Sequence, residues 1–240
     1  MISVCLATHN GEKYIKNQLD SILNQLADND EVIVSDDGST DKTIQILLGY
    51  NDPRIHIYNY KQPSVVKHPH EYVCRNFENA LKHVKGDYIF LSDQDDEWMP
   101  NKVKKCISVL HGCDLLVHDF YLMNENGEVT SERLHHNGKY RFRNYLMREG
   151  KPYGCAMAFR RDVLKYALPF PKHLLLHDYW IGILVETLGK FQFVKEPLIK
   201  YRIHQQNTSS TSNPLLYKIT YRIKTICHLT IRVVKNKFGL

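Results

Sequence analysis

Short apolar runs alternate, in the first half of the chain, with segments in which apolar residues recur at every third or fourth position. Buried strands are expected at the apolar runs, which are residues 2–7, 31–35, 54–58, 87–91 and 114–118. Helices are expected at the periodic segments, which are residues 42–48, 71–84 and 101–110 and the segment that carries Ile15, Leu19, Ile22 and Leu23 on one face. Strands that alternate with helices predict an α/β fold with a mostly parallel sheet between the helices.

The pattern loosens after about residue 120. The expected elements of this second half are a turn at 124–127, a short helix or lid at 140–147, a strand at 153–159, helices at 161–166 and 178–188, and two strand pieces within 191–201. The two pieces are expected to be separated at Pro197, because proline cannot donate a hydrogen bond within a sheet.

Polar residues follow three of the expected strands, at the point where each strand ends. They are Thr8 to Asn10, then Asp36 and Asp37, then Asp93, Asp95 and Asp96. Ligands bind at the carboxyl ends of the strands in parallel α/β sheets. We therefore expect these three clusters, which are far apart in the sequence, to share one site.

The acidic residues at positions 93, 95 and 96 predict a metal site. Carboxylates this close repel one another unless a hard cation such as Mg²⁺ or Mn²⁺ holds them together. The alternative is a solvated acidic turn in which Asp96 caps the next helix. The convergence of three polar clusters on one edge of the sheet favours the metal site.

Five motifs together resemble those of the family 2 inverting glycosyltransferases, which have the GT-A fold. Three of them lie at the strand ends and are Ala7-Thr8-His9-Asn10-Gly11-Glu12-Lys13-Tyr14, Ser35-Asp36-Asp37-Gly38-Ser39-Thr40-Asp41 and Leu91-Ser92-Asp93-Gln94-Asp95-Asp96-Glu97-Trp98. Two later motifs look particularly like bacterial rhamnosyltransferase-type members and are His177-Asp178-Tyr179-Trp180 and Tyr201-Arg202-Ile203-His204-Gln205-Gln206-Asn207.

The resemblance covers residues 1–207 and gives the domain organisation. At 240 residues with 43% hydrophobic content, the chain can bury one large core. The resemblance implies one GT-A domain, in which residues 1–119 bind the nucleotide sugar and residues 120–207 bind the acceptor. Residues 208–240 are expected to form a separate tail.

The resemblance also implies which residues bind the donor and the metal. The expected contacts of the donor nucleotide are Ala7, Thr8, His9, Asn10, Glu12, Asp36, Asp37 and Asp93. A carboxylate acceptor suits the N–H of a pyrimidine base, although an ordinary capped helix start is the alternative for residues 36–41. Asp95 and Asp93 are expected to hold Mn²⁺ or Mg²⁺. His204 would complete the metal shell or touch the diphosphate, and a surface or structural role is its alternative.

Inversion at the anomeric carbon requires one general base, and the resemblance assigns this role to Asp178. Helix capping is its alternative role. Trp98, Gly154, His177 and Trp180 are the acceptor-binding candidates, since aromatic rings stack on sugar faces and a glycine lets an acceptor approach the backbone. Core packing is the alternative for both tryptophans and for Gly154.

These residues predict a metal-dependent inverting glycosyltransferase. It would transfer a sugar from a nucleoside-diphosphate sugar to a glycan or lipid-linked acceptor in bacterial surface polysaccharide synthesis, with dTDP-rhamnose as the favoured donor from the resemblance. A nucleotidyltransferase of related fold is one alternative, but it would carry a Gly-rich loop with Arg or Lys where this chain has His9-Asn10-Gly11-Glu12-Lys13. A non-catalytic nucleotide-sugar-binding or membrane-scaffold subunit is the other.

The net charge of +6 belongs to the tail, because Glu196 is the last acidic residue and eight of the 32 Lys and Arg residues follow it. A helix over residues 213–238 would place Leu216, Ile219, Ile223, Ile226, Val233 and Val234 on one face, opposite Lys218, Arg222, Lys224, Arg232 and Lys235. Such a helix suits an anionic membrane surface. Packing on the body or on a second subunit, as in a homodimer, is the alternative. No nucleic-acid partner is expected.

Cysteine usage and the lack of a long apolar run indicate the compartment. The six cysteines contain no CxxC pair, which fits a reducing cytosol. The start of the chain has no basic leader, and no uncharged apolar run reaches the roughly 18 residues needed to cross a bilayer. We therefore expect a cytoplasmic protein whose tail is a peripheral contact with the inner face of the cell membrane.

Overall fold

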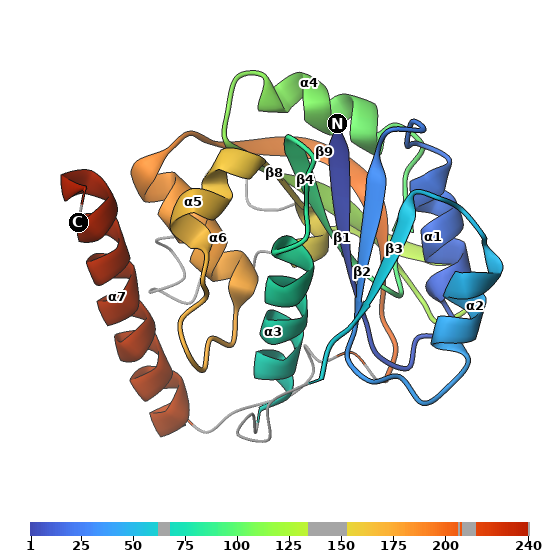
Figure 1. Ribbon diagram of the computed structural model, residues 1–240, viewed down its shortest axis with the longest axis horizontal. Helices are drawn as coiled ribbons and strands as arrows, with labels where there is room; N and C mark the ends of the chain where they lie inside the picture. The colour runs from blue at the N-terminus through green and yellow to red at the C-terminus, as the bar shows by residue number, and fades with distance from the viewer. Residues whose placement is uncertain (62–67, 134–152, 206, 208–214, 240) are drawn as a thin grey trace.

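One mixed β-sheet runs through the protein, and helices flank it (Figure 1). The computed structural model describes residues 1–61, 68–133, 153–205, 207 and 215–239, with side chains from residue 219 onward in the last helix. Within these residues the sheet has nine strands. The helix or lid expected at residues 140–147 lies outside the described residues.

The N-terminal half follows the predicted alternation of strands and helices. Its parallel strands are β1 (Ile2–Thr8), β2 (Glu31–Asp36), β3 (Ile55–Asn59) and β4 (Tyr88–Asp93), arranged β3-β2-β1-β4. Its helices are α1 (Ile15–Leu23), α2 (Thr43–Gly49), α3 (Pro69–Leu81) and α4 (Lys102–Leu110). The predicted strands and the predicted helices of this half are both confirmed, and their ends differ from the predicted ones by a few residues.

The register of these strands explains why the polar clusters meet. Thr8 in β1 pairs with Asp36 in β2, and Ala7 in β1 pairs with Asp93 in β4. Strands of similar length that start in register also end in register, so their carboxyl ends form one edge. Residues 3–6 of β1 are fully buried. Only the residues at the carboxyl end of this strand therefore remain available for a site at that edge.

The second half adds strands in both directions. They are β5 (Glu97–Trp98), β6 (Leu115–Met123), β7 (Val129–Arg133), β8 (Met157–Arg160) and β9 (Phe191–Arg202). β8 lies antiparallel between β4 and β6, and β9 runs parallel to β6 and pairs antiparallel with β5 through its last residues. The turn expected at 124–127 joins β6 to β7, which the sequence pattern did not predict as a strand.

Two expectations in this half need correction. β9 is one continuous strand rather than two pieces, and the effect of Pro197 is a shift in its register with β6 between Val194 and Pro197. The strand expected at 153–159 begins with a 3₁₀ turn, Gly154–Ala156, before β8. A further 3₁₀ turn (Arg161–Val163) leads into the short helix α5 (Leu164–Ala167), and α6 (His177–Leu188) follows as predicted.

The helices cover the sheet, and the last helix lies beside them. α3 packs on β1 and β2, whereas α4 packs on β6, β8 and β9. The last helix, α7 (Leu215–Phe238), runs along α6 at the edge of the molecule, far from α1 and α2 (Figure 1). Among the described residues, no helix is both long and apolar enough to span a bilayer.

Candidate active site

The turn after β2 is organised by the Asp36 side chain. This carboxylate is buried and accepts hydrogen bonds from Thr8 Oγ1 at 2.9 Å, from the Ser39 N–H at 2.8 Å and from Ser39 Oγ at 2.5 Å. Its Oδ1 and Oδ2 atoms are both used within the protein. Asp36 therefore shapes the turn and leaves the neighbouring Asp37 closer to solvent.

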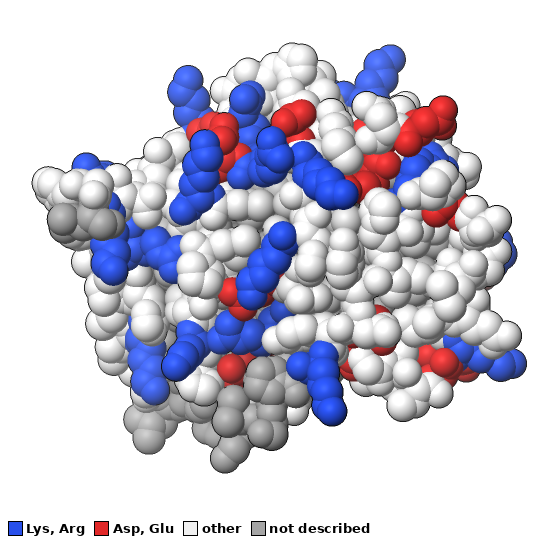
Figure 2. All heavy atoms as spheres, viewed as in Figure 1, with Lys and Arg blue, Asp and Glu red and all other residues white. Residues whose placement is uncertain are grey.

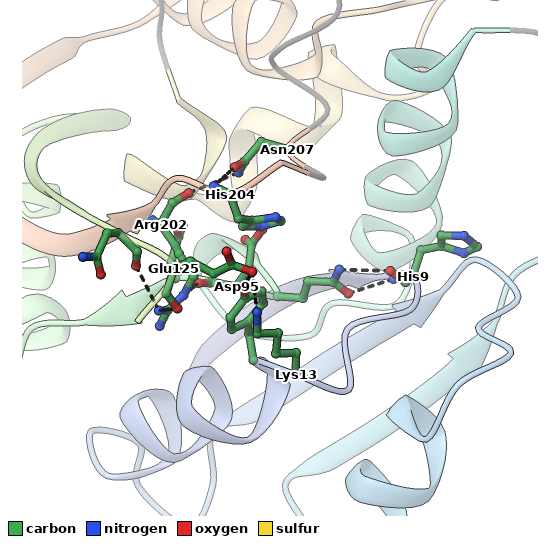
Figure 3. A network of polar contacts seen from close by, with 11 residues as sticks. His9, Lys13, Asp95, Glu125, Arg202, His204 and Asn207 are labelled. Atoms are coloured by element: carbon green, nitrogen blue, oxygen red, sulfur yellow. Dashed lines mark hydrogen bonds and ion pairs between the residues drawn. The ribbon is translucent and has the colours of Figure 1, made fainter. Parts of the chain in front are cut away.

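The turn after β1 is held to the other two strand ends by His9. The His9 N–H donates to Gln94 Oε1 at 2.9 Å, and Gln94 Nε2 donates to the His9 carbonyl at 3.0 Å (Figure 3). His9 Nδ1 lies 2.8 Å from the Asp37 carbonyl oxygen. A Cβ atom at Gly11 would lie 2.4 Å from Gln94 Oε1, so a side chain there would displace the Gln94 amide from its hydrogen bonds to His9.

Asn10 and Glu12 form hydrogen bonds to the turn after β2. The Asn10 N–H donates to Ser39 Oγ and its Oδ1 accepts from the Thr40 N–H, both at 2.8 Å. Glu12 Oε2 accepts from the Lys42 N–H at 2.9 Å. Two turns that are about 30 residues apart in the chain thus form one polar rim, which contains five of the predicted donor-binding residues: His9, Asn10, Glu12, Asp36 and Asp37.

Acidic side chains gather at the end of β4, where they are buried or half-buried. Asp96 is fully buried, and its Oδ1 accepts from the Arg202 N–H at 3.0 Å. Burial raises the pKa of Asp93 to about 7, and the negative charges of Asp95 and Asp178 add to this shift. Ligand atoms of Asp93, Asp96 and Cys155 lie within 4.8 Å of one another. The protein holds these acids together against their mutual repulsion.

Two predicted metal ligands meet beside this cluster. Asp95 Oδ2 lies 2.7 Å from His204 Nε2, although the residues are 109 positions apart in the chain. His204 is fixed by Asn207, whose Oδ1 accepts from the His204 N–H at 2.5 Å and whose Nδ2 donates to the Arg202 carbonyl at 3.1 Å (Figure 3). Carboxylate oxygens are ligands that suit Mn²⁺ or Mg²⁺, and the imidazole nitrogen beside them, a softer ligand, favours Mn²⁺ of the two. These residues therefore fit the predicted divalent cation.

Arg202, at the end of β9, is a residue whose role the sequence pattern did not reveal. Its side chain is buried and donates to three backbone carbonyl groups: Asp95 at 2.8 Å, Glu125 at 3.0 Å and Asn124 at 3.3 Å. The guanidinium also lies 4.6 Å from the centre of the Tyr14 ring. Arg202 thus connects the acidic loop to the β6–β7 turn and to the start of α1.

Glu125, in the β6–β7 turn, ties the same turn to the first motif. It forms an ion pair with Lys13, and its Oε1 accepts from the Tyr14 hydroxyl at 3.2 Å (Figure 3). The Tyr14 ring in turn packs against the His204 ring, with 5.1 Å between their centres. Lys13 and Tyr14 lie in the first motif and Arg202 lies in the last one, but the sequence pattern indicated no role for these three residues, and Glu125 was expected only in a turn.

Asp178 lies in the first turn of α6, and its charge faces the acidic cluster. Asp178 Oδ1 accepts from the N–H of Tyr179 at 2.8 Å, and the side chain is 8% exposed. The positive end of the helix dipole favours the ionised carboxylate there. Burial is the main cause of the raised pKa of Asp93, and the negative charge of Asp178 contributes to it after that of Asp95, so the carboxyl groups of Asp178 and Asp93 interact electrostatically. Capping and catalysis are compatible roles at this position.

His177 is held in a closed apolar pocket next to Asp178. Its ring stacks on Phe77 with 4.3 Å between centres, and its Nδ1 lies 3.7 Å from Cys74 Sγ. Burial lowers the pKa of His177 to about 3, so the ring is neutral at physiological pH. A Cβ atom at Gly154 would lie 2.7 Å from His177 Nε2, which makes Gly154 part of the wall of this pocket.

The structure places both tryptophans in the core. Trp98 is 3% exposed and packs between Phe90 and the Lys102 ammonium group, whereas Trp180 is fully buried and donates from Nε1 to the Ala167 carbonyl at 2.8 Å. A ring buried to this extent has no face on which a sugar can stack. Core packing, the alternative for both residues, is what the structure favours.

Comparison with solved structures supports the predicted fold. Staphylococcus aureus TarS 1-349 in complex with UDP-GlcNAc superposes with a TM-score of 0.70 at 20% sequence identity, covering 96% of this chain. This chain spans 66% of that TarS chain. The likeness confirms the GT-A-type architecture, a mostly parallel sheet flanked by helices.

Sequence comparison identifies the family. The putative teichuronic acid biosynthesis glycosyltransferase TuaG of Bacillus subtilis is 30% identical over 216 residues, which cover 88% of this chain and 82% of TuaG. The dTDP-rhamnosyl transferase RfbG of Shigella flexneri is 29% identical over 253 residues, which cover 97% of this chain and 80% of RfbG. The family model described as Glycosyl transferase family 2 matches residues 3–167. Because this match spans well over half of the chain and contains the three strand-end motifs, the chain belongs to glycosyl transferase family 2.

Proposed function

We propose that the chain transfers a sugar, with inversion, from a nucleoside-diphosphate sugar to a hydroxyl group of a glycan or lipid-linked acceptor. The observation that carries this proposal is the contact of Asp95 with His204 beside Asp93, at the edge that Asp178 also faces. Inverting transfer needs a site for the diphosphate and a base for the acceptor, and these four residues offer both.

The donor nucleotide would lie on the rim formed by the turns after β1 and β2. Asp37 is the residue proposed to accept the N–H of a pyrimidine base, because it is partly exposed at the rim, whereas Asp36 is buried. His9, Asn10 and Glu12 hold the rim in shape through their bonds to residues 37–42. A preorganised rim lowers the entropic cost of binding the donor.

Asp95, Asp93 and His204 are the residues that would hold Mn²⁺ or Mg²⁺. Such a cation supplies positive charge to the diphosphate, which stabilises the nucleotide as a leaving group. The residues themselves orient the donor by presenting carboxylate and imidazole groups from β4 and from the loop after β9. Burial raises the pKa of Asp93, the negative charges of Asp95 and Asp178 raise it further, and a bound cation would favour the ionised carboxylate against both effects.

Asp178 is proposed as the general base that takes the proton of the acceptor hydroxyl as it attacks the anomeric carbon. An inverting reaction requires one such base on the face opposite the leaving group. The start of α6 presents the carboxylate, and the neutral His177 beside it adds no competing positive charge. His177 and Gly154 would then shape the wall near the acceptor rather than bind it as charged groups.

The donor is proposed to be dTDP-rhamnose, and the pathway is proposed to be synthesis of a bacterial surface polysaccharide. The names of two relatives support this choice: RfbG is a dTDP-rhamnosyl transferase, and TuaG is assigned to teichuronic acid biosynthesis. Both cover most of this chain and most of their own length.

A panel of nucleotide sugars, incubated with Mn²⁺ or Mg²⁺ and assayed for released nucleoside diphosphate, tests the proposal. We expect turnover with one pyrimidine nucleotide sugar, its loss in EDTA, and its loss in Asp95→Ala. Asp178→Asn should bind the donor normally but turn over about 100- to 10,000-fold more slowly, the usual contribution of a general base. Exposed Asp162, which pairs only with Lys165 among the contacts of the described chain, provides the matched control Asp162→Asn.

Full activity in EDTA would exclude the metal role, and near-normal turnover of Asp178→Asn would exclude Asp178 as the base. Donor binding without turnover for any donor and acceptor pair would favour the non-catalytic alternative.

A further inference from the structure

One face of α7 is fixed to the body of the protein. The Arg232 guanidinium donates to three backbone carbonyl groups, those of Tyr166 at 2.8 Å, Leu168 at 2.9 Å and Pro169 at 2.7 Å. The Leu175 N–H donates to the Tyr221 hydroxyl at 3.0 Å. Leu229 and Thr225 are buried between these two anchors. Arg232, through these bonds, and Val233, which packs against the core, face the body, in contrast to the faces on which the sequence pattern placed them.

The opposite face of α7 is apolar and open to solvent. Its exposed large hydrophobic residues, between 40% and 73% exposed, are Ile219, Ile223, Ile226, Ile231, Val234 and Phe238. At 100° per residue, these side chains spread over the side of the helix away from Leu229 and Arg232. Single exposed apolar residues are common, but six on one helix face indicate a binding surface.

The charges around this face have one sign. Among the side chains of α7 that the structure describes, the exposed lysines are Lys224, Lys235 and Lys237, and the sequence of the helix contains no acidic residue. On the face shown in Figure 2, the outer edge of the molecule at α7 is mostly uncharged, and the blue atoms gather toward the body. At 100° per residue, Lys224 and Lys235 border the apolar strip, whereas Lys237 lies in line with Ile219 near the C-terminal end of the helix.

This pattern disfavours pairing of two α7 helices. A second copy laid against the apolar strip would bring the lysines of both helices together, with no carboxylate on either helix to offset the repulsion. An anionic lipid surface has the matching chemistry: the acyl region accepts the apolar strip, and the phosphate layer accepts the lysines.

We propose that the outward face of α7 binds an anionic lipid surface and that the anchored inner face carries the catalytic body with it. Because the Arg232 and Tyr221 contacts are directed to the body, lipid binding does not require the helix to detach. The domain would then lie on the membrane in one orientation, which suits an acceptor presented on a lipid. Lipid binding is measured without donor or acceptor, so its result is independent of the transfer proposed above.

Co-sedimentation with vesicles tests the inference. The protein is mixed with vesicles of phosphatidylcholine alone, or of phosphatidylcholine with phosphatidylglycerol, and the bound fraction is measured at low and high salt. We expect binding only to the vesicles that contain phosphatidylglycerol, weakened by salt. The double variant Ile223→Ser/Ile231→Ser should remain in the supernatant. Leu48→Ser, which changes an apolar residue that is 65% exposed on α2, should bind like the unaltered protein.

Charge variants separate the electrostatic component of lipid binding from the apolar component. Lys224→Gln and Lys235→Gln should each weaken partitioning about fivefold, the change that corresponds to about 1 kcal/mol per basic residue near an anionic surface. Binding of the unaltered protein that is absent, or equal with and without phosphatidylglycerol, would overturn the inference. So would a serine variant that binds as well as the unaltered protein. A dimer in solution that the serine variant converts to monomer would assign the face to self-association instead.

Discussion

Oδ2 of Asp95 and Nε2 of His204 lie 2.7 Å apart, and the β5–β9 pairing explains how two such distant residues meet. Glu97 pairs with Lys200, and Trp98 pairs with Ile199. Asp95 lies just before β5 and His204 lies just after β9. Because the two strands pair antiparallel, Asp95 and His204 lie next to each other at the same end of the strand pair. Their separation is fixed by backbone hydrogen bonds rather than by the flexibility of two loops.

His204→Ala is expected to weaken the binding of Mn²⁺ by at least about tenfold, because it removes the imidazole nitrogen next to Asp95. Calorimetric titration of Mn²⁺ in the presence of the nucleoside diphosphate measures this change. Exposed His228, on α7, supplies the control His228→Ala, which should leave Mn²⁺ binding unchanged. Equal Mn²⁺ affinity in His204→Ala and the unaltered protein would remove His204 from the metal shell.

Arg202→Lys is expected to lower the free energy of unfolding by about 2 kcal/mol and to weaken Mn²⁺ binding. A lysine keeps the charge, but its single ammonium group cannot donate to three carbonyl groups and also stack on the Tyr14 ring. The loss should loosen the segment that carries His204. Denaturant unfolding and Mn²⁺ titration measure the two effects.

Arg232→Lys is a matched control for that variant, since Arg232 also serves three carbonyls but lies on α7, away from the acidic cluster. It should lower stability without changing Mn²⁺ affinity. If both variants lower Mn²⁺ affinity equally, the effect of Arg202 is a general loss of stability and not a local one.

Gly154→Ala is expected to destabilise the protein by about 1 to 3 kcal/mol and to slow transfer, because the new methyl group would lie 2.7 Å from His177 Nε2. The stacked Phe77 ring leaves the imidazole little room to move, so α6 and Asp178 would shift. Donor binding, measured by thermal stabilisation, should remain. Gly112→Ala, where the nearest atom would be 3.7 Å away, should be close to neutral.

The buried His177 should make the protein less stable in mild acid. The pKa of its imidazole is lowered by burial from 6.5 to about 3, so the unfolded chain binds a proton near pH 6.5 whereas the folded protein does not until about pH 3. The stability that neutral His177 contributes is therefore complete above pH 6.5 and is lost as the pH falls from 6.5 toward 3. Relative to His177→Gln, the free energy of unfolding should fall by about 1.4 kcal/mol per pH unit in this window. Parallel pH profiles for the two proteins would contradict the burial of His177.

The elements of the N-terminal half could be predicted from the sequence because their signals are local. A buried parallel strand is a continuous apolar run, and an amphipathic helix repeats every three or four residues. The convergence of Thr8, Asp36 and Asp93 also followed, since parallel strands end on one edge. The family motifs added roles for Asp95, His204 and Asp178, and the structure brings Asp95 and His204 into contact.

The parts that could not be predicted depend on long-range pairing. β5 has only two residues, too few for any periodicity, and it exists because β9 lies beside it. The contacts of Arg202 and of Glu125 join segments about 80 to 110 residues apart, so no local window contains them. Trp98 and Trp180 show a different limit, because the same aromatic residue suits a sugar platform and a core until the neighbouring packing is known.

The uneven burial of the cysteines gives the protein a built-in labelling site. Cys5, Cys74, Cys106, Cys113 and Cys155 are buried, and burial raises the pKa of each thiol above its usual value, which suppresses the reactive thiolate. Cys227 is the one exposed thiol among the six, and at 100° per residue it falls between Ile223 and Ile231 on the outward side of α7. A maleimide fluorophore should therefore attach at Cys227 alone in the native enzyme, where its emission would report directly how deeply that helix enters a bilayer.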